Sequence, residues 1–116
     1  MVGHDDGRIG VRFGAVGDAG PDDALLIEGD ASADRPAVAR FAIIARIAAH
    51  PIGCACCAPR GPTADALGRL FLARARGEMP WFHRVVAVTH TDAGAAAVRA
   101  ALQEDVVTTA RFRADP

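Results

Sequence analysis

The chain of 116 residues contains no lysine, and all 13 of its basic residues are arginine. This absence excludes every mechanism that needs a lysine, including a Schiff base and the phosphate-binding lysine of a P-loop. Aromatic residues are also scarce, at 5% of the chain. The apolar residues are mostly Ala, Val, Leu and Ile, which suit packed strands and helices better than platforms on which nucleic-acid bases stack.

Long apolar runs and a large net charge are absent too. No stretch approaches the roughly 20 apolar residues that span a bilayer, and the polar residues 1–6 do not resemble a signal peptide. The net charge is −1 and no basic patch stands out, which argues against a nucleic-acid partner. The three cysteines come without a secretion signal, so we expect a cytoplasmic protein whose thiols bind metal or stay free.

The pattern of apolar residues predicts one α/β domain over residues 1–116. A helix and a strand alternate along the second half, which implies a small, mainly parallel sheet with helices packed on it. The stretch at 36–50 fits a helix or a strand, and we favour a strand at 40–48 that runs towards the cysteines. We expect helices at 63–77 (capped by Thr63) and 92–103 (capped by Thr91 or Asp92), strands at 8–13, 40–48, 84–90 and 106–113, a loop at 14–23 and a short apolar segment at 24–28.

The three cysteines fall within four consecutive positions, at Cys54, Cys56 and Cys57. Thiolates this close together usually hold a soft metal ion or carry out redox chemistry. In an extended segment Cys54 and Cys56 point to the same side, and a turn in the helix-breaking residues 58–62 would bring Cys57 towards them. We therefore expect a zinc site rather than inert buried thiols.

A tetrahedral zinc site needs at least one further ligand, and the candidates are His90, His50, Asp18 and water. His90 is expected just after a strand, at the carboxyl edge of the sheet, where the ligands of α/β folds gather. It could equally be a partly exposed neighbour of a helix cap. His50 would lie roughly 13 Å from Cys54 along an extended segment. We expect His4 and His83 to be surface residues.

The cysteine segment, Gly53-Cys54-Ala55-Cys56-Cys57, resembles the Gly-Cys-X-Cys-Cys motif of the CobW-like metal-centre GTPases, which are related to UreG and HypB. Three flanking segments resemble parts of that family in the same order. Residues 8–22 are similar to the family's first strand and Gly-Glu-X-Gly-X-Asp loop, with Asp18 where glutamate is usual. Residues 82–86 are similar to its Asp-Arg-apolar strand. Residues 110–115 are similar to its Ala-Arg-Phe-Arg-Leu-Asp region. The resemblance implies a partial P-loop-NTPase-like domain that binds Zn²⁺ or Co²⁺.

The chain departs from this family where the nucleotide would bind. No Walker A motif is present, and none is possible without lysine. The family's Glu-Thr-Thr-Gly element is matched by Val88-Thr89-His90-Thr91, which lacks the carboxylate and the glycine. The guanine-specificity motif would lie beyond Pro116. The resemblance therefore implies a truncated, degenerate relative without the N-terminal P-loop segment, and we expect neither a bound nucleotide nor GTPase activity.

Three functions compete on these observations. The first is a non-enzymatic metal-binding protein that resembles CobW-like metallochaperones. The second is a protein-interaction module whose exposed sheet edge pairs with a second copy or with a full-length CobW-like GTPase. The third is a thiol redox protein, for which the nearby Arg60 is the one feature that would lower a thiol pKa.

Overall fold

A single parallel sheet forms the centre of the domain. The computed structural model describes residues 7–43 and 61–115. Within them the strands are β1 (Ile9–Phe13), β2 (Asp23–Glu28), β3 (Val38–Phe41), β4 (Arg84–Val88) and β5 (Phe112–Ala114), in the order β3-β2-β4-β1-β5. Every neighbouring pair is parallel. The predicted α/β class with a mainly parallel sheet is confirmed.

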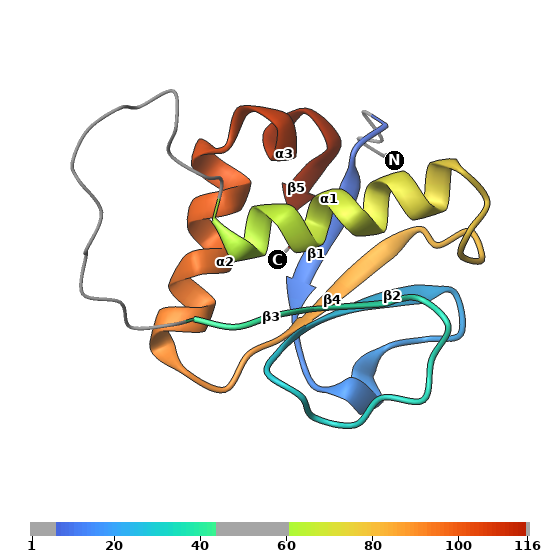
Figure 1. Cartoon of the computed structure of the whole chain (residues 1–116), viewed down its shortest axis with the longest axis horizontal. Coiled ribbons are helices and arrows are strands. Elements are labelled where there is room, and N and C mark those ends of the chain that lie inside the picture. The colour runs from blue at the N-terminus through green and yellow to red at the C-terminus, as the bar shows by residue number, and fades with distance from the viewer. Residues whose placement is uncertain (1–6, 44–60, 116) are drawn as a thin grey trace.

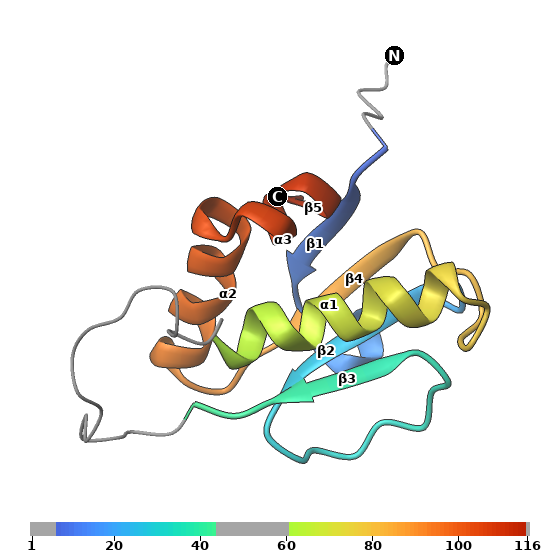
Figure 2. The same cartoon turned by 45° about the horizontal axis from the view of Figure 1, so that its top comes forward.

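The helices described are α1 (Pro62–Ala75), α2 (Asp92–Glu104) and α3 (Val106–Arg111), with a short 3-10 turn, η1 (Val16–Asp18). Figures 1 and 2 show α1 lying across one face of the sheet, with α2 beside the start of α1. None of these helices is long and apolar enough to cross a membrane. The bounds of α1 and α2 agree with the predicted helices to within two residues.

The core is divided by the sheet into a large and a small part. Alternate strand residues, such as Val11 and Val85, face α1 and α2 and pack with Leu67, Leu70 and Val98. The intervening residues face the other side, where Leu25, Ile27 and Val86 form a smaller cluster covered by loop residues such as Val16 and Ala33. Strands with apolar residues on both faces are typical of parallel sheets.

The strand predicted at 40–48 is wrong in its bounds. β3 begins two residues earlier, at Val38, and ends at Phe41. Its neighbour β2 ends at Glu28, and Gly29 turns away with a φ of +89° after donating a 2.8 Å hydrogen bond to the Phe41 carbonyl. Among the described residues, the pairing of β3 with β2 therefore ends at Phe41. Ala42 and Ile43 lie outside the strand, and positions 44–48 are outside the described residues.

The strand predicted at 106–113 is also wrong over most of its length, because residues 106–111 form α3. The carboxylate of Asp105 accepts hydrogen bonds from the Thr108 amide (2.9 Å) and the Thr108 hydroxyl (2.7 Å). This N-cap outweighs the strand preference of Val106 and Val107. Within the predicted strand, only the residues from Phe112 onward are extended, and Phe112–Ala114 pairs with β1 as an edge strand.

The predicted cap of α1 is wrong, whereas that of α2 is confirmed. Gly61 is the N-cap of α1 and Pro62 its first residue, which leaves Thr63 buried inside the helix. Proline suits the first helical position because no amide is needed there. At α2 the Thr91 hydroxyl accepts a 2.9 Å hydrogen bond from the Gly94 amide, as an N-cap residue does.

Candidate functional site

The carboxyl edge of the sheet gathers the ends of several segments. β2 ends there with Glu28, and β4 leads into His90 and the start of α2. The connection between the parallel strands β3 and β4 runs through α1, so α1 begins on the carboxyl side of the sheet and returns to the amino side. Figures 1 and 2 accordingly show the end of β3 and the start of α1 on the same side of the sheet.

The best-defined polar centre at this edge is the buried carboxylate of Glu28. Its Oε1 accepts hydrogen bonds from the amides of His90 (2.9 Å) and Thr91 (3.1 Å), and its Oε2 accepts one from the Thr91 hydroxyl (2.6 Å). The three donors come from the residues that lead into α2, so Glu28 fixes the start of this helix against the end of β2.

The surroundings keep Glu28 ionised. Burial alone would raise the pKa of its carboxyl, but hydrogen bonds from Thr91 and His90, together with the charge of the His90 imidazole when it is protonated, hold the pKa below its ordinary value. The positive end of the α2 dipole acts in the same direction. Gly94 is required for this approach, because a Cβ there would lie 2.0 Å from Glu28 Oε1.

His90 lies beside this carboxylate with its imidazole largely in solvent. Its side chain is 67% exposed, and its Nε2 is 3.8 Å from Glu28 Oε2. Gly29 leaves room for the ring, since a Cβ on Gly29 would lie 3.3 Å from that Nε2. Metal-binding histidines usually donate the N–H of their second ring nitrogen to a carboxylate, and at 3.8 Å the Glu28 carboxylate lies beside the His90 ring without a hydrogen bond to it. The predicted position of His90 at the carboxyl edge is confirmed, and its role as a ligand stays a prediction.

Asp18, the other candidate ligand in the described part of the chain, is exposed in η1, within the loop from β1 to β2. Its carboxylate turns back to its own loop and accepts a 2.7 Å hydrogen bond from the Ala15 amide. Within residues 7–43 and 61–115, no three His, Cys, Asp or Glu side chains form a group that could hold a metal ion.

The remaining candidate ligands are Cys54, Cys56, Cys57 and His50, and all four lie outside the described residues. His4 and Arg60 lie outside them as well. The predicted exposure of His83 is confirmed, and this residue lies at the amino edge of the sheet, just before β4.

Sequence reasoning missed Glu28, although the chain carries a signal for it. Glu28 directly follows the apolar run of residues 24–27 and precedes a glycine. An ionisable residue at the end of a buried strand must find partners, because an unpaired buried charge is costly. The partner amides, those of His90 and Thr91, lie 62 and 63 residues further along the chain, and no local pattern indicates them.

Comparison with known proteins adds no relative: no protein-family model matches the sequence, and neither a curated protein nor a solved structure matches the chain. The resemblance to CobW-like proteins therefore stays a hypothesis that rests on the quoted segments.

Proposed function

We propose that this chain is a non-enzymatic metal-binding protein of the CobW-like metallochaperone type, and that Cys54, Cys56 and Cys57 bind Zn²⁺ or Co²⁺. The observation that supports the proposal most is where the cysteine-containing connection is attached. β3 ends at Phe41 and α1 begins at Pro62, and both points lie on the carboxyl side of the sheet. The exposed His90 lies on that side too, next to an ionised carboxylate.

The chemistry of the donors suits a borderline-soft dication. Three thiolates and one imidazole form a common closed set around zinc, and in this proposal His90 is the fourth ligand. Glu28 then acts without touching the metal: its carboxylate, with Oε2 3.8 Å from His90 Nε2, adds a negative charge near the dication. Asp18 is a weaker candidate for the fourth ligand, because the Ala15 amide already engages its carboxylate. If neither residue binds the metal, the fourth position falls to His50 or to a water molecule.

Titration of the fully reduced protein with Co²⁺ tests this proposal. We expect one Co²⁺ per chain, with thiolate-to-metal charge-transfer bands in the near ultraviolet. Cys56→Ser should reduce the intensity of these bands, because one of the three thiolates is lost. It should also weaken binding by more than the roughly 10- to 100-fold that loss of an outer-shell partner costs. A fully reduced sample without charge-transfer bands would contradict the proposal.

A pair of histidine variants tests the fourth ligand. His90→Ala should weaken Co²⁺ binding and shift the visible d–d bands, because the coordination sphere changes. His83→Ala is the matched control, since this exposed histidine lies at the opposite edge of the sheet, and it should leave affinity and spectrum unchanged. Equal effects of the two substitutions would remove His90 from the site while leaving the cysteines in place.

The second candidate function, a protein-interaction module, is favoured by the groove beside the edge strand β3. Val38, Arg40, Leu72 and Met79 are among the residues that line this groove between β3 and α1, and Leu72 is exposed. However, Arg69 donates a 3.0 Å hydrogen bond to the Arg40 carbonyl and so occupies an acceptor that an added strand would need. Size-exclusion chromatography with light scattering tests this candidate, which a monomer at all concentrations would contradict.

A further inference from the structure

A groove of about 580 Å³ runs between the edge strand β3 and the C-terminal half of α1. β3 pairs with β2 on one side, and Figure 2 shows it at the border of the sheet, alongside α1. No other described strand covers the outer side of β3. The border of a sheet is a usual place for a segment of another protein to dock.

One side of α1 forms a wall of this groove. Four residues at helical spacing share that side and line the groove: Arg69, Leu72, Ala73 and Arg76. Leu72 is 40% exposed and lies between the two arginines, whose Cα atoms are about 10 Å apart along the helix axis. Val38 and Met79, which are half-buried, line the same groove. An exposed apolar strip with polar residues at its rim is typical of an interaction surface.

The chain itself does not neutralise the cations of this groove. Arg69 donates a 3.0 Å hydrogen bond to the Arg40 carbonyl, and the Arg40 side chain donates to two backbone carbonyls of the loop after β2. These neutral acceptors leave the charge of each guanidinium uncancelled. Among the described residues, Arg40, Arg69 and Arg76 form no ion pair, and Glu78 is the one acidic residue of the described lining.

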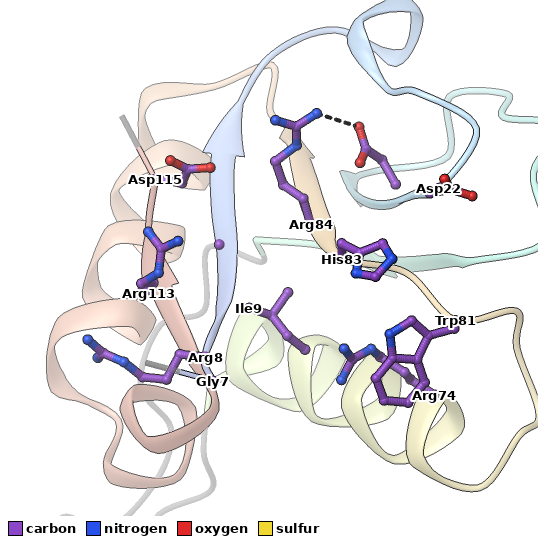
Figure 3. A pocket seen from close by; sticks show the side chains of 12 residues that line it. Gly7, Arg8, Ile9, Asp22, Arg74, Trp81, His83, Arg84, Arg113 and Asp115 are labelled. Atoms are coloured by element: carbon purple, nitrogen blue, oxygen red, sulfur yellow. Dashed lines mark hydrogen bonds and ion pairs between the residues drawn. The ribbon is translucent and has the colours of Figure 1, made fainter. Parts of the chain in front are cut away.

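The arginine-lined cavity at the amino edge of the sheet differs in this respect. Figure 3 shows Arg84 joined to a carboxylate, that of Asp23, whose Oδ2 is 3.1 Å from Arg84 Nη2. A second carboxylate, that of Asp115, covers Gly10, where a Cβ would lie 3.0 Å from its Oδ2. The chain thus supplies its own anions at the amino edge, whereas the groove beside β3 leaves its arginines without one.

We propose that this groove binds an acidic peptide segment of a partner protein, with an apolar side chain on Leu72 and carboxylates at Arg69 and Arg76. In an extended peptide the side chains of residues i, i+2 and i+4 point the same way, and the outer two are about 13 Å apart. This span suits two long arginine side chains, so Glu-x-Leu-x-Glu is the simplest matching pattern. The bond from Arg69 to the Arg40 carbonyl favours docking through side chains over addition of a β-strand.

A second copy of the chain fits this groove less well. Pairing of two copies along β3 would bring the arginines of both grooves together, and like charges across an interface are destabilising. A small amphiphile fits less well too, because small-molecule sites usually enclose most of the ligand and Leu72 is open to solvent. The inference goes beyond the metal-binding function and does not depend on it.

Fluorescence anisotropy with a labelled peptide, Ser-Glu-Ser-Leu-Ser-Glu-Ser, tests the inference in the absence of added metal. We expect a saturable rise in anisotropy, and much weaker binding when glutamine replaces both glutamates of the peptide. Arg76→Glu should weaken binding of the glutamate peptide roughly tenfold, because an attraction becomes a repulsion. Leu72→Ala should weaken it as well. Arg99→Glu is the matched control, because Arg99 is exposed on α2 and outside the groove lining.

The glutamine peptide separates lost charge pairing from a damaged fold, because Arg76→Glu should affect its binding much less than that of the glutamate peptide. The inference is overturned if the glutamate peptide gives no saturable signal, or if the glutamine peptide binds equally well. It is also overturned if Arg99→Glu weakens binding as much as Arg76→Glu does. A dimer, detected by light scattering, that the peptide dissociates would assign the groove to a second copy instead. Displacement of the peptide by an equal concentration of laurate would assign it to a small amphiphile.

Discussion

Glu28 connects the end of β2 with the start of α2, and its contribution to stability should depend on pH. It is buried and ionised, and it accepts its hydrogen bonds from the Thr91 hydroxyl and from the amides of His90 and Thr91. Its pKa in the folded chain lies below the ordinary value of 4.5. A carboxyl group with a lowered folded pKa stabilises the fold above its unfolded pKa, and this stability is lost as the pH falls through the folded value.

Replacement by the neutral amide isolates this contribution. Glu28→Gln should lower the free energy of unfolding at pH 7 by about 2 kcal/mol. The substitution replaces hydrogen bonds to a buried charged group with weaker hydrogen bonds to a neutral amide. The difference from the wild type should shrink as the pH falls below 4.5, where the unfolded wild type takes up protons first. Urea unfolding at a series of pH values measures both effects.

Glu104→Gln is the matched control, because Glu104 is exposed at the other end of α2. It should change stability at pH 7 by less than about 0.5 kcal/mol. A Glu28→Gln variant as stable as this control at pH 7, or a difference from the wild type that grows towards acid pH, would contradict the role given to Glu28.

At the scale of elements, α3 shows how one side chain decides between helix and strand. Residues 106–109 are all β-branched, and Val106 is 81% exposed, so burial of that side chain does not hold the segment in a helix. Asp105 does, through its two hydrogen bonds to Thr108. The sequence contained this cap, but a pattern of β-branched residues favours a strand unless the preceding aspartate is considered.

Removal of this cap should loosen α3 in particular. Asp105→Ala is expected to lower the free energy of unfolding by about 1 kcal/mol, the usual cost of losing an N-cap. Hydrogen exchange of the amides in α3 should accelerate more than that of the amides in β4. Glu104→Ala, one residue earlier and exposed, should leave the exchange in α3 unchanged, and equal acceleration by both variants would contradict the capping role.

At the scale of the whole molecule, local patterns predicted the architecture and missed the contacts across it. The alternation of helix and strand after residue 62 correctly indicated a parallel sheet, because the crossover that joins parallel strands is usually a helix. The neighbours β2 and β3 are an exception, since residues 29–37 join them without a helix. The order of the strands and their register bring together Glu28 with Thr91 and Arg84 with Asp23. Neither pair is visible in the sequence, since pairing over some 60 residues depends on the packing of the complete sheet.

The domain thus has two chemically different edges. The carboxyl edge holds the pair of Glu28 and His90 on the side where the connection that carries the cysteines begins and ends. The amino edge holds the arginine-lined cavity. The proposed metal site can be tested with a control at the other edge, because a substitution there, such as His83→Ala, leaves the residues of the carboxyl edge in place.

The metal content of the chain tests the central claim most directly. The protein is purified under reducing conditions without chelators and passed through a size-exclusion column, with light scattering and elemental analysis of the same peak. The account predicts about one equivalent of Zn²⁺ or Co²⁺ per chain for the wild type and for His83→Ala, and a much lower content for Cys56→Ser. A wild-type protein that is folded and fully reduced, yet carries no metal even after incubation with excess Zn²⁺, would contradict the account.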